Sequence, residues 1–386
     1  MRDKEQWVRK KLGDSDVSKI IMGQSPSSAA YNEEEVGLPF LQGCAEFGYV
    51  YPNTSIFCSD ILKIAPENSI LMSVRAPVGA INKADQKYVI GRGLCSIVPM
   101  IDGGYLYYYL LQNTHELELK AQGSTFLAIN STDLNEMPIC YPDSPPAQRR
   151  IAAILSSADK VIEQTRQLIG KYKSIKQGMM EDLLRPKEGW KKVRLGDCLK
   201  QKPDYGINAP AVPYDNLLPT YLRITDITED GYYSKKDIVS VASPEAWKYI
   251  MEEGDLVFAR TGASVGKTYL YNPNDGVLVF AGFLIRVRTN KDLLLPEFFK
   301  YQTQTPQYKN WIAANSMRTG QPGINGNEYE EFSFYMPYNN GAPDLHEQRR
   351  IAKILSGIDR KIEAEEKVLE KYENMKKGLM ERLLNG

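Results

Sequence analysis

The chain contains one stretch of sequence twice. Residues 148–184 read QRRIAAILSSADKVIEQTRQLIGKYKSIKQGMMEDLL, and residues 348–384 read QRRIAKILSGIDRKIEAEEKVLEKYENMKKGLMERLL. The two copies align without a gap at an offset of 200, and about half of their positions are identical. Each copy follows a longer segment, and these two segments are much less alike. A repeat of this kind predicts two similar halves, each consisting of a head domain followed by one long helix.

Both copies carry the pattern of a helix that packs against another helix. Apolar residues recur at alternating steps of three and four, which is a heptad seam. Polar residues interrupt the seam at Thr165, Glu365, Lys176 and Lys376, and polar seam residues help to define register and partner. We expect the helices to form an antiparallel coiled coil, because the chain returns to the same end after each head. The predicted helix-pair core consists of Ile151, Leu155, Ile162, Ile169, Tyr172, Ile351, Leu355, Ile362, Leu369 and Tyr372.

Start and stop signals bound the two predicted helices. Ser144 can cap the first helix, with Pro145 at its first position, and Pro186 ends it. Asp344 can cap the second helix, and Glu347 three residues later would complete a capping box. The predicted division of the chain is a head over 1–143, a helix over 144–185, a head over 186–343 and a helix over 344–386.

The two heads share short anchors, although their interiors differ. Each begins with a tryptophan, Trp7 or Trp190, followed at the same spacing by Leu-Gly-Asp. Each then has a strand-like run, an arginine (Arg75 or Arg260) and a turn ending in Val-Gly. The longer anchors are NSILMSVRAPVGA (68–80) with GDLVFARTGASVGK (254–267), and GSTFLAIN (123–130) with TGQPGIN (319–325). Short β-rich runs alternate with Gly, Pro and Asn turns, which predicts mixed α/β heads. The expected fold class is therefore α+β with a pseudo-two-fold internal repeat.

Composition limits the classes of protein to which the chain can belong. No apolar run approaches the roughly 18–20 residues that span a membrane, and the first residues, MRDKEQWVRKK, are too charged for a signal peptide. The five cysteines are odd in number and widely spaced, which fits the reduced thiols of a cytoplasmic protein. His115 and His346 are the only histidines, which argues against a metal site and a Ser-His-Asp hydrolase.

The charge of the chain is zero overall but is unevenly distributed. Residues 1–147 and 201–347 each carry about five more acidic than basic side chains, whereas the two helical segments are basic. A non-specific nucleic-acid binder is normally basic overall. Any binding of DNA must therefore use local basic clusters, or a partner must supply much of the phosphate contact.

One motif resembles a nucleotide-binding loop but has the wrong spacing. A Walker A loop needs four residues between its glycines before the lysine, and only three separate Gly262 from Gly266. The sequence also lacks a GxGxxG segment after a strand, a PD…(D/E)xK arrangement and an Asn/Asp-Pro-Pro-Tyr segment. We therefore predict no catalytic residues in this chain.

The arrangement of the chain resembles that of a known family. The order head, long helix, head, long helix, with QRRIAxIL opening each helix and KYxxxKxGxMExLL closing it, resembles the specificity subunit of Type I restriction-modification enzymes. The resemblance covers essentially the whole chain, and it departs from the family pattern at Ala147, where the second copy has Glu347.

The resemblance implies a function and a set of partners. Each head would be a target recognition domain that reads one half of a bipartite, asymmetric site in double-stranded DNA. The paired helices would set the spacing of the heads and dock two methyltransferase (modification) subunits, and a restriction subunit would join them. S-adenosylmethionine and ATP with Mg would bind to those partners, so that this chain would hold no cofactor and would not be catalytic.

The chemistry of DNA recognition narrows the choice of contact residues in the heads. Base edges are read by Arg, Asn, Gln and Lys, and phosphates by Lys, Arg and the backbone N–H groups of glycine-rich turns. A shared salt bridge is the alternative role for Arg75 and Arg260, and a turn cap is the alternative role for Asn130 and Asn325. The predicted DNA-binding residues are Arg75, Arg92, Gln122, Thr125, Asn130, Arg260, Lys267, Arg318, Gln321 and Asn325.

Two other classes of function stay open at this point. The first is a two-headed coiled-coil adaptor that binds only proteins, which the acidic heads would suit. The second is an enzyme with a diverged nucleotide site at Gly262–Thr268.

Overall fold

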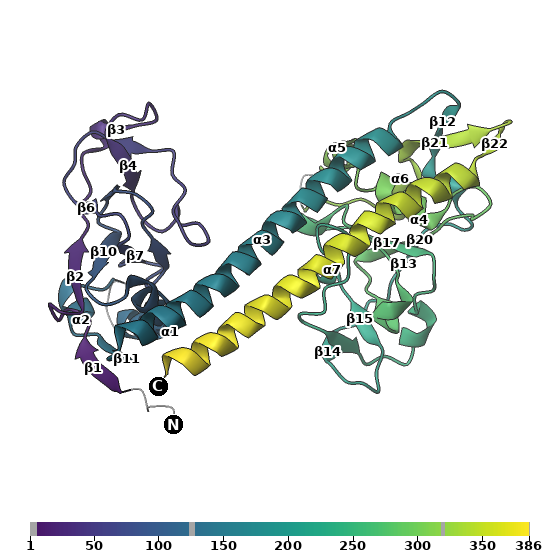
Figure 1. Ribbon diagram of the computed structural model, residues 1–386. Coiled ribbons are helices and arrows are strands. Elements are labelled where there is room, and N and C mark those ends of the chain that lie inside the picture. The colour runs from purple at the N-terminus through teal and green to yellow at the C-terminus, as the bar shows by residue number, and fades with distance from the viewer. Residues whose placement is uncertain (1–5, 123–127, 318–320, 386) are drawn as a thin grey trace. The chain divides into compact units, whose positions relative to one another are not determined.

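The computed structural model describes residues 6–122, 128–317 and 321–385, except for the side chains of residues 115–122 (Figure 1). It has an α+β fold. The chain divides into two compact units, the first made of residues 1–169 and 365–386 and the second of residues 170–364. Each long helix therefore contributes one part of its length to each unit.

The two repeated stretches form the long helices α3 (Pro145–Leu184) and α7 (Leu345–Leu384). Asp344 caps α7 as predicted, because its Oδ1 accepts a hydrogen bond from the backbone N–H of Glu347 at 2.9 Å. The predicted capping box is wrong. The Glu347 carboxylate accepts hydrogen bonds from Arg350 at 2.6 and 2.7 Å, and the N–H of Asp344 donates to Pro337 O instead. A charged guanidinium one turn along the helix is a stronger donor than a backbone amide.

The helices contact each other within each unit, and the contacts run in opposite order along the two helices (Figure 1). In the first unit Arg166 pairs with Glu373 at 2.6 Å, and Asp159 pairs with Lys376 at 2.5 Å. Among the predicted helix-pair core residues, Tyr172, Leu369 and Tyr372 are only partly buried. The buried ones are Ile151, Leu155, Ile162, Ile169, Ile351, Leu355 and Ile362.

Asp159 of α3 is a buried carboxylate on which three groups converge in the first unit. Its oxygens accept hydrogen bonds from the hydroxyls of Tyr49 at 2.9 Å and Tyr108 at 2.6 Å, and from Lys376 Nζ of α7. A carboxylate this deeply buried needs both a counter-ion and hydrogen-bond donors to offset its lost hydration. Lys376, which interrupts the apolar seam, supplies that counter-ion.

Asp359 of α7 occupies the matching position in the second unit. Lys176 Nζ of α3 lies 2.8 Å from Asp359 Oδ1, the Tyr301 hydroxyl donates to Oδ2 at 2.7 Å, and Lys300 Nζ lies 3.7 Å from Oδ2. Burial by itself raises the pKa of Asp359, but Lys176, Lys300 and the Tyr301 hydroxyl outweigh it, so the net pKa lies below the ordinary value. The two seam lysines thus neutralise two buried aspartates, each on the opposite helix.

A glutamine near the start of each long helix fastens the helix to a head. Gln148 Oε1 accepts a hydrogen bond from the N–H of Asp102 at 2.9 Å, and its Nε2 donates to Pro142 O at 2.8 Å. Gln348 does the same in the second unit, where it accepts from the N–H of Leu295 at 2.9 Å and donates to Leu293 O at 3.0 Å. The QRRI motif is therefore both a helix start and a side-chain link to the neighbouring head.

Within its described residues, the first head contains three small sheets and two α-helices. The sheets have the strand orders β1-β11, β2-β10-β7-β8 and β3-β5-β4-β9-β6. Its helices are α1 (Gly103–Gln122) and α2 (Ser131–Asn135). Its strands are β1 (Trp7–Lys11), β2 (Ser18–Met22), β3 (Tyr31–Asn32), β4 (Leu38–Leu41), β5 (Phe57–Cys58), β6 (Ile64–Ala65), β7 (Ile70–Ser73), β8 (Ile81–Lys83), β9 (Tyr88–Ile90), β10 (Leu94–Pro99) and β11 (Pro138–Pro142).

The second head repeats much of this strand pairing. Its sheets have the orders β12-β21-β22, β13-β20-β17-β18 and β14-β16-β15-β19. Its helices are α4 (Pro296–Gln302), α5 (Pro306–Ser316) and α6 (Gly326–Glu330). Its strands are β12 (Trp190–Arg194), β13 (Asp204–Tyr205), β14 (Ala211–Pro213), β15 (Thr220–Leu222), β16 (Val239–Val241), β17 (Asp255–Ala259), β18 (Thr268–Leu270), β19 (Leu278–Phe280), β20 (Leu284–Arg288), β21 (Ser333–Asn339) and β22 (Ala342–Pro343).

The main core of each unit joins a head to parts of both long helices. In the first unit Ile151 and Leu155 of α3 and Met380 and Leu384 of α7 are buried in one cluster with α1. In the second unit Met180 and Leu184 of α3 and Ile351 and Leu355 of α7 are buried with the aromatic side chains of α4. One hydrophobic core cluster of each head is therefore shared with the helices, which attaches the head to them by packing.

The buried ion pairs lead to a prediction about the stability of the folded protein. Substituting Lys176→Met should destabilise the protein by about 3 kcal/mol at pH 7, because it leaves Asp359 buried without its closest counter-ion. Because the pKa of Asp359 is lowered in the folded protein, its contribution to stability is present above the ordinary value of 3.8 and is lost as the pH falls through the lowered value. Denaturant unfolding at pH 7 and pH 3 should therefore show a smaller loss at pH 3. Lys171→Met, at an exposed position of the same helix, is the control, and an equal loss at both pH values would contradict the assignment.

Candidate nucleic-acid interface

The anchor 68–80 and the described end of the anchor 123–130 meet at one place in the first head, beside Gly93. The N–H of Val74, just after β7, donates to Gly93 O at 2.9 Å, and the N–H of Ile129 donates to Val74 O at 2.9 Å. Arg75 forms an isolated β-bridge with Ala128. We call the group formed by Val74, Arg75, Gly93 and 128–130 the first motif junction.

The second head brings the corresponding anchors together in the same way. The N–H of Arg260, just after β17, donates to Phe283 O at 3.1 Å, and the N–H of Ile324 donates to Arg260 O at 2.9 Å. Thr261 forms an isolated β-bridge with Gly323. The group formed by Arg260, Thr261, Phe283 and 323–325 is the second motif junction.

The two junctions show that Arg75 and Arg260 are not equivalent. Strand register places Ser73 opposite Leu94, and Ala259 opposite Leu284. Val74 therefore corresponds to Arg260, and Arg75 corresponds to Thr261. The predicted equivalence is wrong by one residue, and such a slip turns a side chain to the opposite face of a strand. The turns that follow the two arginines differ in length, so the arginines do not occupy the same strand position although the sequences around them are similar.

The described residues provide no carboxylate partner for either arginine, so the alternative of a shared salt bridge is not supported. Arg75 is exposed, whereas Arg260 is partly buried with its guanidinium carbon 5.1 Å from the centre of the Tyr205 ring. Arg92, also exposed, lies on the turn between β9 and β10, where its backbone N–H donates to Ser25 Oγ at 3.0 Å. Arg75 and Arg92 thus place positive charge near the first motif junction, in a head that is acidic overall.

Asn130 and Asn325 both cap short helices. The Asn130 Oδ1 accepts from the N–H of Asp133 at 2.9 Å at the start of α2, and the Asn325 Oδ1 accepts from the N–H of Glu328 at 3.0 Å at the start of α6. Both caps are completed as capping boxes by the acidic residue three positions later. The alternative role as a cap is therefore real for both, and DNA contact through the remaining amide group stays a prediction.

The other predicted contact residues are scattered. Lys267 Nζ lies 2.7 Å from the Glu229 carboxylate, so its charge is already paired. Gln321 lies beside the turn at Gly262, where a Cβ would lie 3.0 Å from its amide nitrogen. Gln122 is the last residue of α1, and its side chain is not described. Thr125 and Arg318 lie outside the described residues.

The loop that resembles a nucleotide site uses its amides internally. The N–H groups of Val265, Gly266 and Lys267 donate to Gly262 O, Ala259 O and Ser264 O. These amides close a tight hairpin between β17 and β18 and do not point to a common centre. A phosphate needs several free N–H groups converging on it, so the geometry agrees with the spacing argument against a nucleotide site.

Tyr205 is a surface residue that the sequence analysis missed. It belongs to the short edge strand β13, is 41% exposed, and its hydroxyl accepts a hydrogen bond from the N–H of Gly326 at 3.0 Å. The Arg260 guanidinium lies over the Tyr205 ring, so Tyr205 adjoins the second motif junction. The residues around Tyr205, such as Pro203 and Gly206, do not indicate in the sequence that this tyrosine contacts an arginine 55 positions later in the chain.

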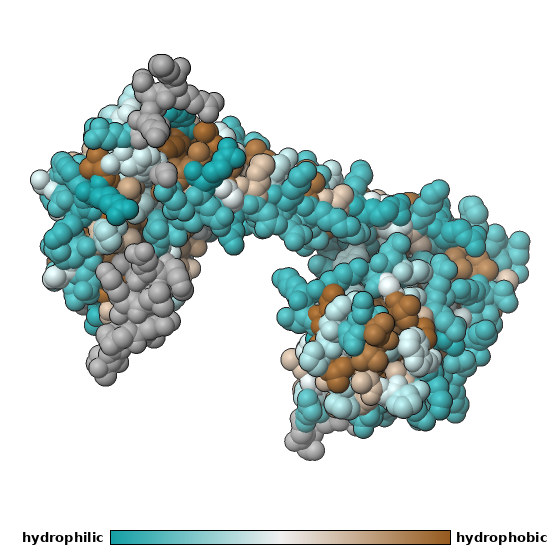
Figure 2. Space-filling view, turned by 90° about the horizontal axis from the view of Figure 1, so that it is seen from below, coloured by the Kyte–Doolittle hydropathy of each residue, from teal (hydrophilic) through white to brown (hydrophobic). Residues whose placement is uncertain are grey.

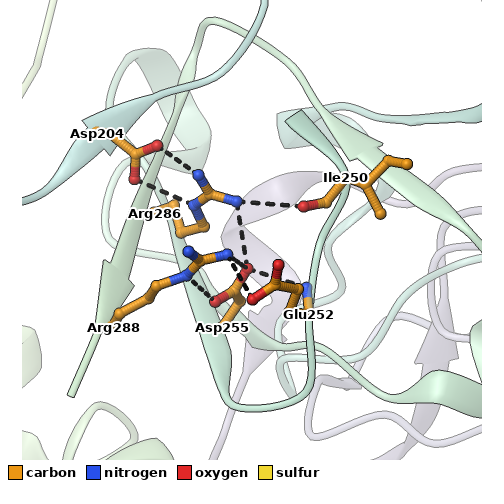
Figure 3. A network of polar contacts seen from close by, with 6 residues as sticks. All are labelled: Asp204, Ile250, Glu252, Asp255, Arg286 and Arg288. Atoms are coloured by element: carbon orange, nitrogen blue, oxygen red, sulfur yellow. Dashed lines mark hydrogen bonds and ion pairs between the residues drawn. The ribbon is translucent and has the colours of Figure 1, made fainter. Parts of the chain in front are cut away.

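A buried ionic network anchors the strand that carries Tyr205 (Figure 3). Arg286 of β20 makes two hydrogen bonds to the Asp204 carboxylate, at 2.6 and 3.1 Å, and one to Asp255 at 3.3 Å. Arg288 bonds to Asp255 Oδ1 at 2.6 Å and pairs with Glu252 at 3.1 Å. Hydrogen bonding to Asp255 is the main cause that raises the pKa of Arg288, so this guanidinium stays charged.

The described residues of the first head form no such network. Strand register matches Arg286 and Asp204 of the second head with Ser96 and Ile21 of the first. The same register matches Asp255 with Ser69. The two heads therefore share a strand arrangement. The side chains next to the edge strands β2 and β13, however, are different.

A separate apolar hollow lies on the second head. Apolar residues gather on the surface of the second unit in Figure 2, and the hollow is lined by exposed side chains that include Tyr214, Leu217 and Trp247. Its lysine, Lys235, is paired with Asp275 at 3.1 Å. Because phosphate contact requires available cations, this hollow is a poorer candidate for DNA than the motif junctions.

The described part of the chain lacks two further kinds of feature. No group of three His, Cys, Asp or Glu side chains there is arranged to hold a metal ion. No helix among the described residues has both the length and the apolar character that crossing a membrane requires.

Known proteins resemble this chain in sequence. A putative type I restriction enzyme specificity subunit (MjaX) of Methanocaldococcus jannaschii is 40% identical over 183 residues, which cover 47% of this chain and 43% of that protein. The matched part thus spans less than half of that relative. A second specificity subunit of the same organism (MjaIX) is 26% identical over 301 residues, covering 67% of each chain.

The fold has also been seen in a solved structure. The crystal structure of a Type I restriction-modification system S subunit from M. genitalium matches with a TM-score of 0.68 at 17% identity, covering 100% of this chain and 98% of that one. At this identity the likeness concerns the fold alone. The model of the Type I restriction modification DNA specificity domain matches residues 4–171 and again residues 187–374. The chain therefore belongs to the Type I restriction modification DNA specificity domain family.

Proposed function

We propose that this protein is the DNA specificity subunit of a Type I restriction-modification complex. The observation that carries the proposal is the match of the specificity-domain model to both halves of the chain. Each head would read one half of a bipartite, asymmetric site in double-stranded DNA. The exposed Arg75 and Arg92, together with Arg260, support this role, because guanidinium groups without carboxylate partners can donate to base edges and phosphates.

We propose that the motif junctions face the DNA. Each junction is held by backbone hydrogen bonds, so its side chains can differ between the heads without altering the surrounding strands. The predicted contact residues that belong to or adjoin the junctions are Arg75, Arg92, Asn130, Arg260, Gln321 and Asn325. Gln122, Thr125, Lys267 and Arg318 stay predictions, and Lys267 is the weakest because Glu229 already pairs with it.

The long helices would form an antiparallel coiled coil that relates the two halves by a pseudo-two-fold repeat. The crossed pairs of Asp159 with Lys376 and Asp359 with Lys176 support this arrangement, because each repeat contributes one acid and one base at the same positions. The domain limits would be a head over 1–143, a helix over 144–185, a head over 186–343 and a helix over 344–386.

The helices also carry a surface suited to a partner. On α3, Ile154, Val161 and Ile175 are 40%, 38% and 39% exposed, and their spacing in multiples of seven keeps them on one face. On α7, Val368 and Met375 are 37% and 49% exposed at the same spacing. We name these residues the outer stripe. A stripe of exposed apolar residues at heptad spacing favours a further helix, and we propose that modification subunits, two in number, dock on it.

The proposed complex assigns the chemistry to other chains. Modification subunits would hold S-adenosylmethionine, a restriction subunit would hold ATP and Mg, and this chain would hold no cofactor and catalyse no reaction. The complex would act in the cytoplasm. The protein-only adaptor is not favoured, because the family of the chain is defined by DNA specificity.

Exchange of one head tests the proposed function. Replacing residues 190–343 with the matching head of a relative of different specificity should change one half-site and leave the other unchanged, because the heads have separate cores. Mapping methylated bases in cells that express the chimera with its modification subunits measures this. A change in both half-sites would show that the heads do not read DNA independently, and no sequence-specific methylation with the unaltered chain would remove the proposed function.

Helix length tests the proposed spacing role. Each long helix has 40 residues, or about 60 Å at 1.5 Å per residue. Inserting seven residues into both helices, beside Arg166 in α3 and Glu373 in α7, keeps the seam in phase and adds about 10 Å. The spacer between half-sites should then lengthen by about three base pairs, since base pairs rise about 3.4 Å each. A matched insertion of two residues should abolish assembly, and an unchanged spacer in the seven-residue variant would contradict the role.

Charge placed on the outer stripe tests docking. Ile154→Glu combined with Val161→Glu should weaken binding of the modification subunit by at least about tenfold, because a carboxylate buried against a partner costs several kcal/mol. Titration calorimetry with the purified subunits measures this, and thermal unfolding of the variant alone should be unchanged. Ala153→Glu, at an exposed neighbouring position off the stripe, adds one such charge and is the matched control for Ile154→Glu alone. Equal binding by all variants would exclude the outer stripe as the docking surface.

A further inference from the structure

We propose that Tyr205 is a positioning residue for recognition by the second head, and that its ring holds the Arg260 guanidinium ready to contact the edge of a guanine. This inference rests on the proposed function and adds a specific side chain and a specific base to it. It starts from the stacking of Arg260 on Tyr205, at 5.1 Å from guanidinium carbon to ring centre.

The backbone of Arg260 is held on both sides. Its N–H donates to Phe283 O and its carbonyl oxygen accepts from the N–H of Ile324. Only the side chain is left to move, and an arginine side chain has several rotatable bonds whose freedom is lost on binding. The Tyr205 ring limits that freedom before DNA arrives. Preorganisation of this kind raises affinity by lowering the cost of ordering.

The stacked guanidinium keeps its donors available. An aromatic ring covers one flat face of the group and leaves the N–H groups at its edge free, and none of the described carboxylates pairs with Arg260. A guanidinium of fixed plane matches the O6 and N7 acceptors of guanine, which lie side by side in the major groove. A guanidinium can also bind a phosphate bidentately, but a lysine neutralises a phosphate as a point charge without a planar fork.

Tyr205 is itself held firmly enough to position another residue. Its hydroxyl accepts a hydrogen bond from the N–H of Gly326 at 3.0 Å, at the first turn of α6. Its neighbour Asp204 is tied to the buried Arg286 by two hydrogen bonds (Figure 3). A strand of two residues has few backbone hydrogen bonds to hold it in place. The ionic network adds side-chain bonds that fix the position of this strand. The network therefore acts on recognition through Tyr205.

The first head lacks every part of this arrangement. By strand register Met22 replaces Tyr205, and Val74 replaces Arg260. Val74 is 3% exposed, so the first head buries an apolar side chain where the second presents an arginine. The contact should therefore contribute to the recognition of one base pair in the second half-site. It should have no counterpart in the first half-site.

The test uses the full chain assembled with its modification subunits and DNA whose two half-sites have been defined by methylation mapping. Dissociation constants are measured for the cognate site and for a set in which each base pair of either half-site is changed in turn. Tyr205→Ala should weaken cognate binding about tenfold, a loss within the range of a cation–π contact and of one bidentate base contact. The loss should come with reduced discrimination at a single G·C pair of the second half-site and unchanged discrimination in the first.

Two further variants separate positioning from folding. Tyr205→Phe removes the hydroxyl but keeps the ring, and it should retain the discrimination. Arg260→Lys keeps the charge but not the planar fork, and it should lose the discrimination as Tyr205→Ala does. Tyr214→Ala, at another exposed tyrosine of the same head, is the control and should bind normally. Adding Tyr205→Ala to Arg260→Ala should cause no further loss.

Three results would overturn the inference. Unchanged discrimination in Tyr205→Ala would show that the ring does not position the arginine. An equal loss of affinity for every sequence, or full activity of Arg260→Lys, would assign Arg260 to a phosphate. If the unaltered complex itself bound DNA without sequence preference, the proposed function would fail along with this inference, whereas the first two results leave the proposed function intact.

Discussion

The architecture depends on two buried aspartates, Asp159 and Asp359, each neutralised by a lysine of the other long helix. A carboxylate removed from water is costly unless it is paired and hydrogen-bonded. Each aspartate satisfies this requirement only when the opposite helix and the tyrosines of a head lie in their places at the same time. A shift of one residue between the helices would leave two acids and two bases buried without partners. Apolar seams tolerate such shifts more easily, because one methylene group can replace another.

The same clusters join the heads to the helices. Tyr108 and Tyr301 come from the heads, so the hydroxyl that satisfies each aspartate also sets the position of the head to which it belongs. Gln148 and Gln348 add a second link, from the helix start to the backbone of the head. Together with the shared hydrophobic cores, these bonds make each head and its helix segments one folded unit. A protein that measures a distance between two sites on DNA would need such rigid attachment.

The heads combine a common framework with different surfaces. The sheets β2-β10-β7-β8 and β13-β20-β17-β18 have the same strand pairing, and the anchor segments of the two heads meet in the same way at the motif junctions. At equivalent positions, however, the first head has Val74, Met22 and Ser96 where the second has Arg260, Tyr205 and Arg286. Backbone hydrogen bonds hold the junction whatever the side chains are, so these positions are free to vary. This separation of framework from surface suits the proposed reading of two different half-sites, one by each head.

The sequence alone determined the internal repeat, the limits of the two long helices and the family of the chain. Helical periodicity and caps are local properties, and a repeat over 37 residues is visible without any structure. The tertiary structure decided the rest. Asp159 and Asp359 look like solvent-exposed residues in the sequence, because a charged residue is buried only when a distant partner neutralises it. Arg75 and Arg260 looked equivalent, because register depends on pairing with strands far along the chain. The meeting of Tyr205 with Arg260 was equally hidden, since contacts between loops leave no periodic signal.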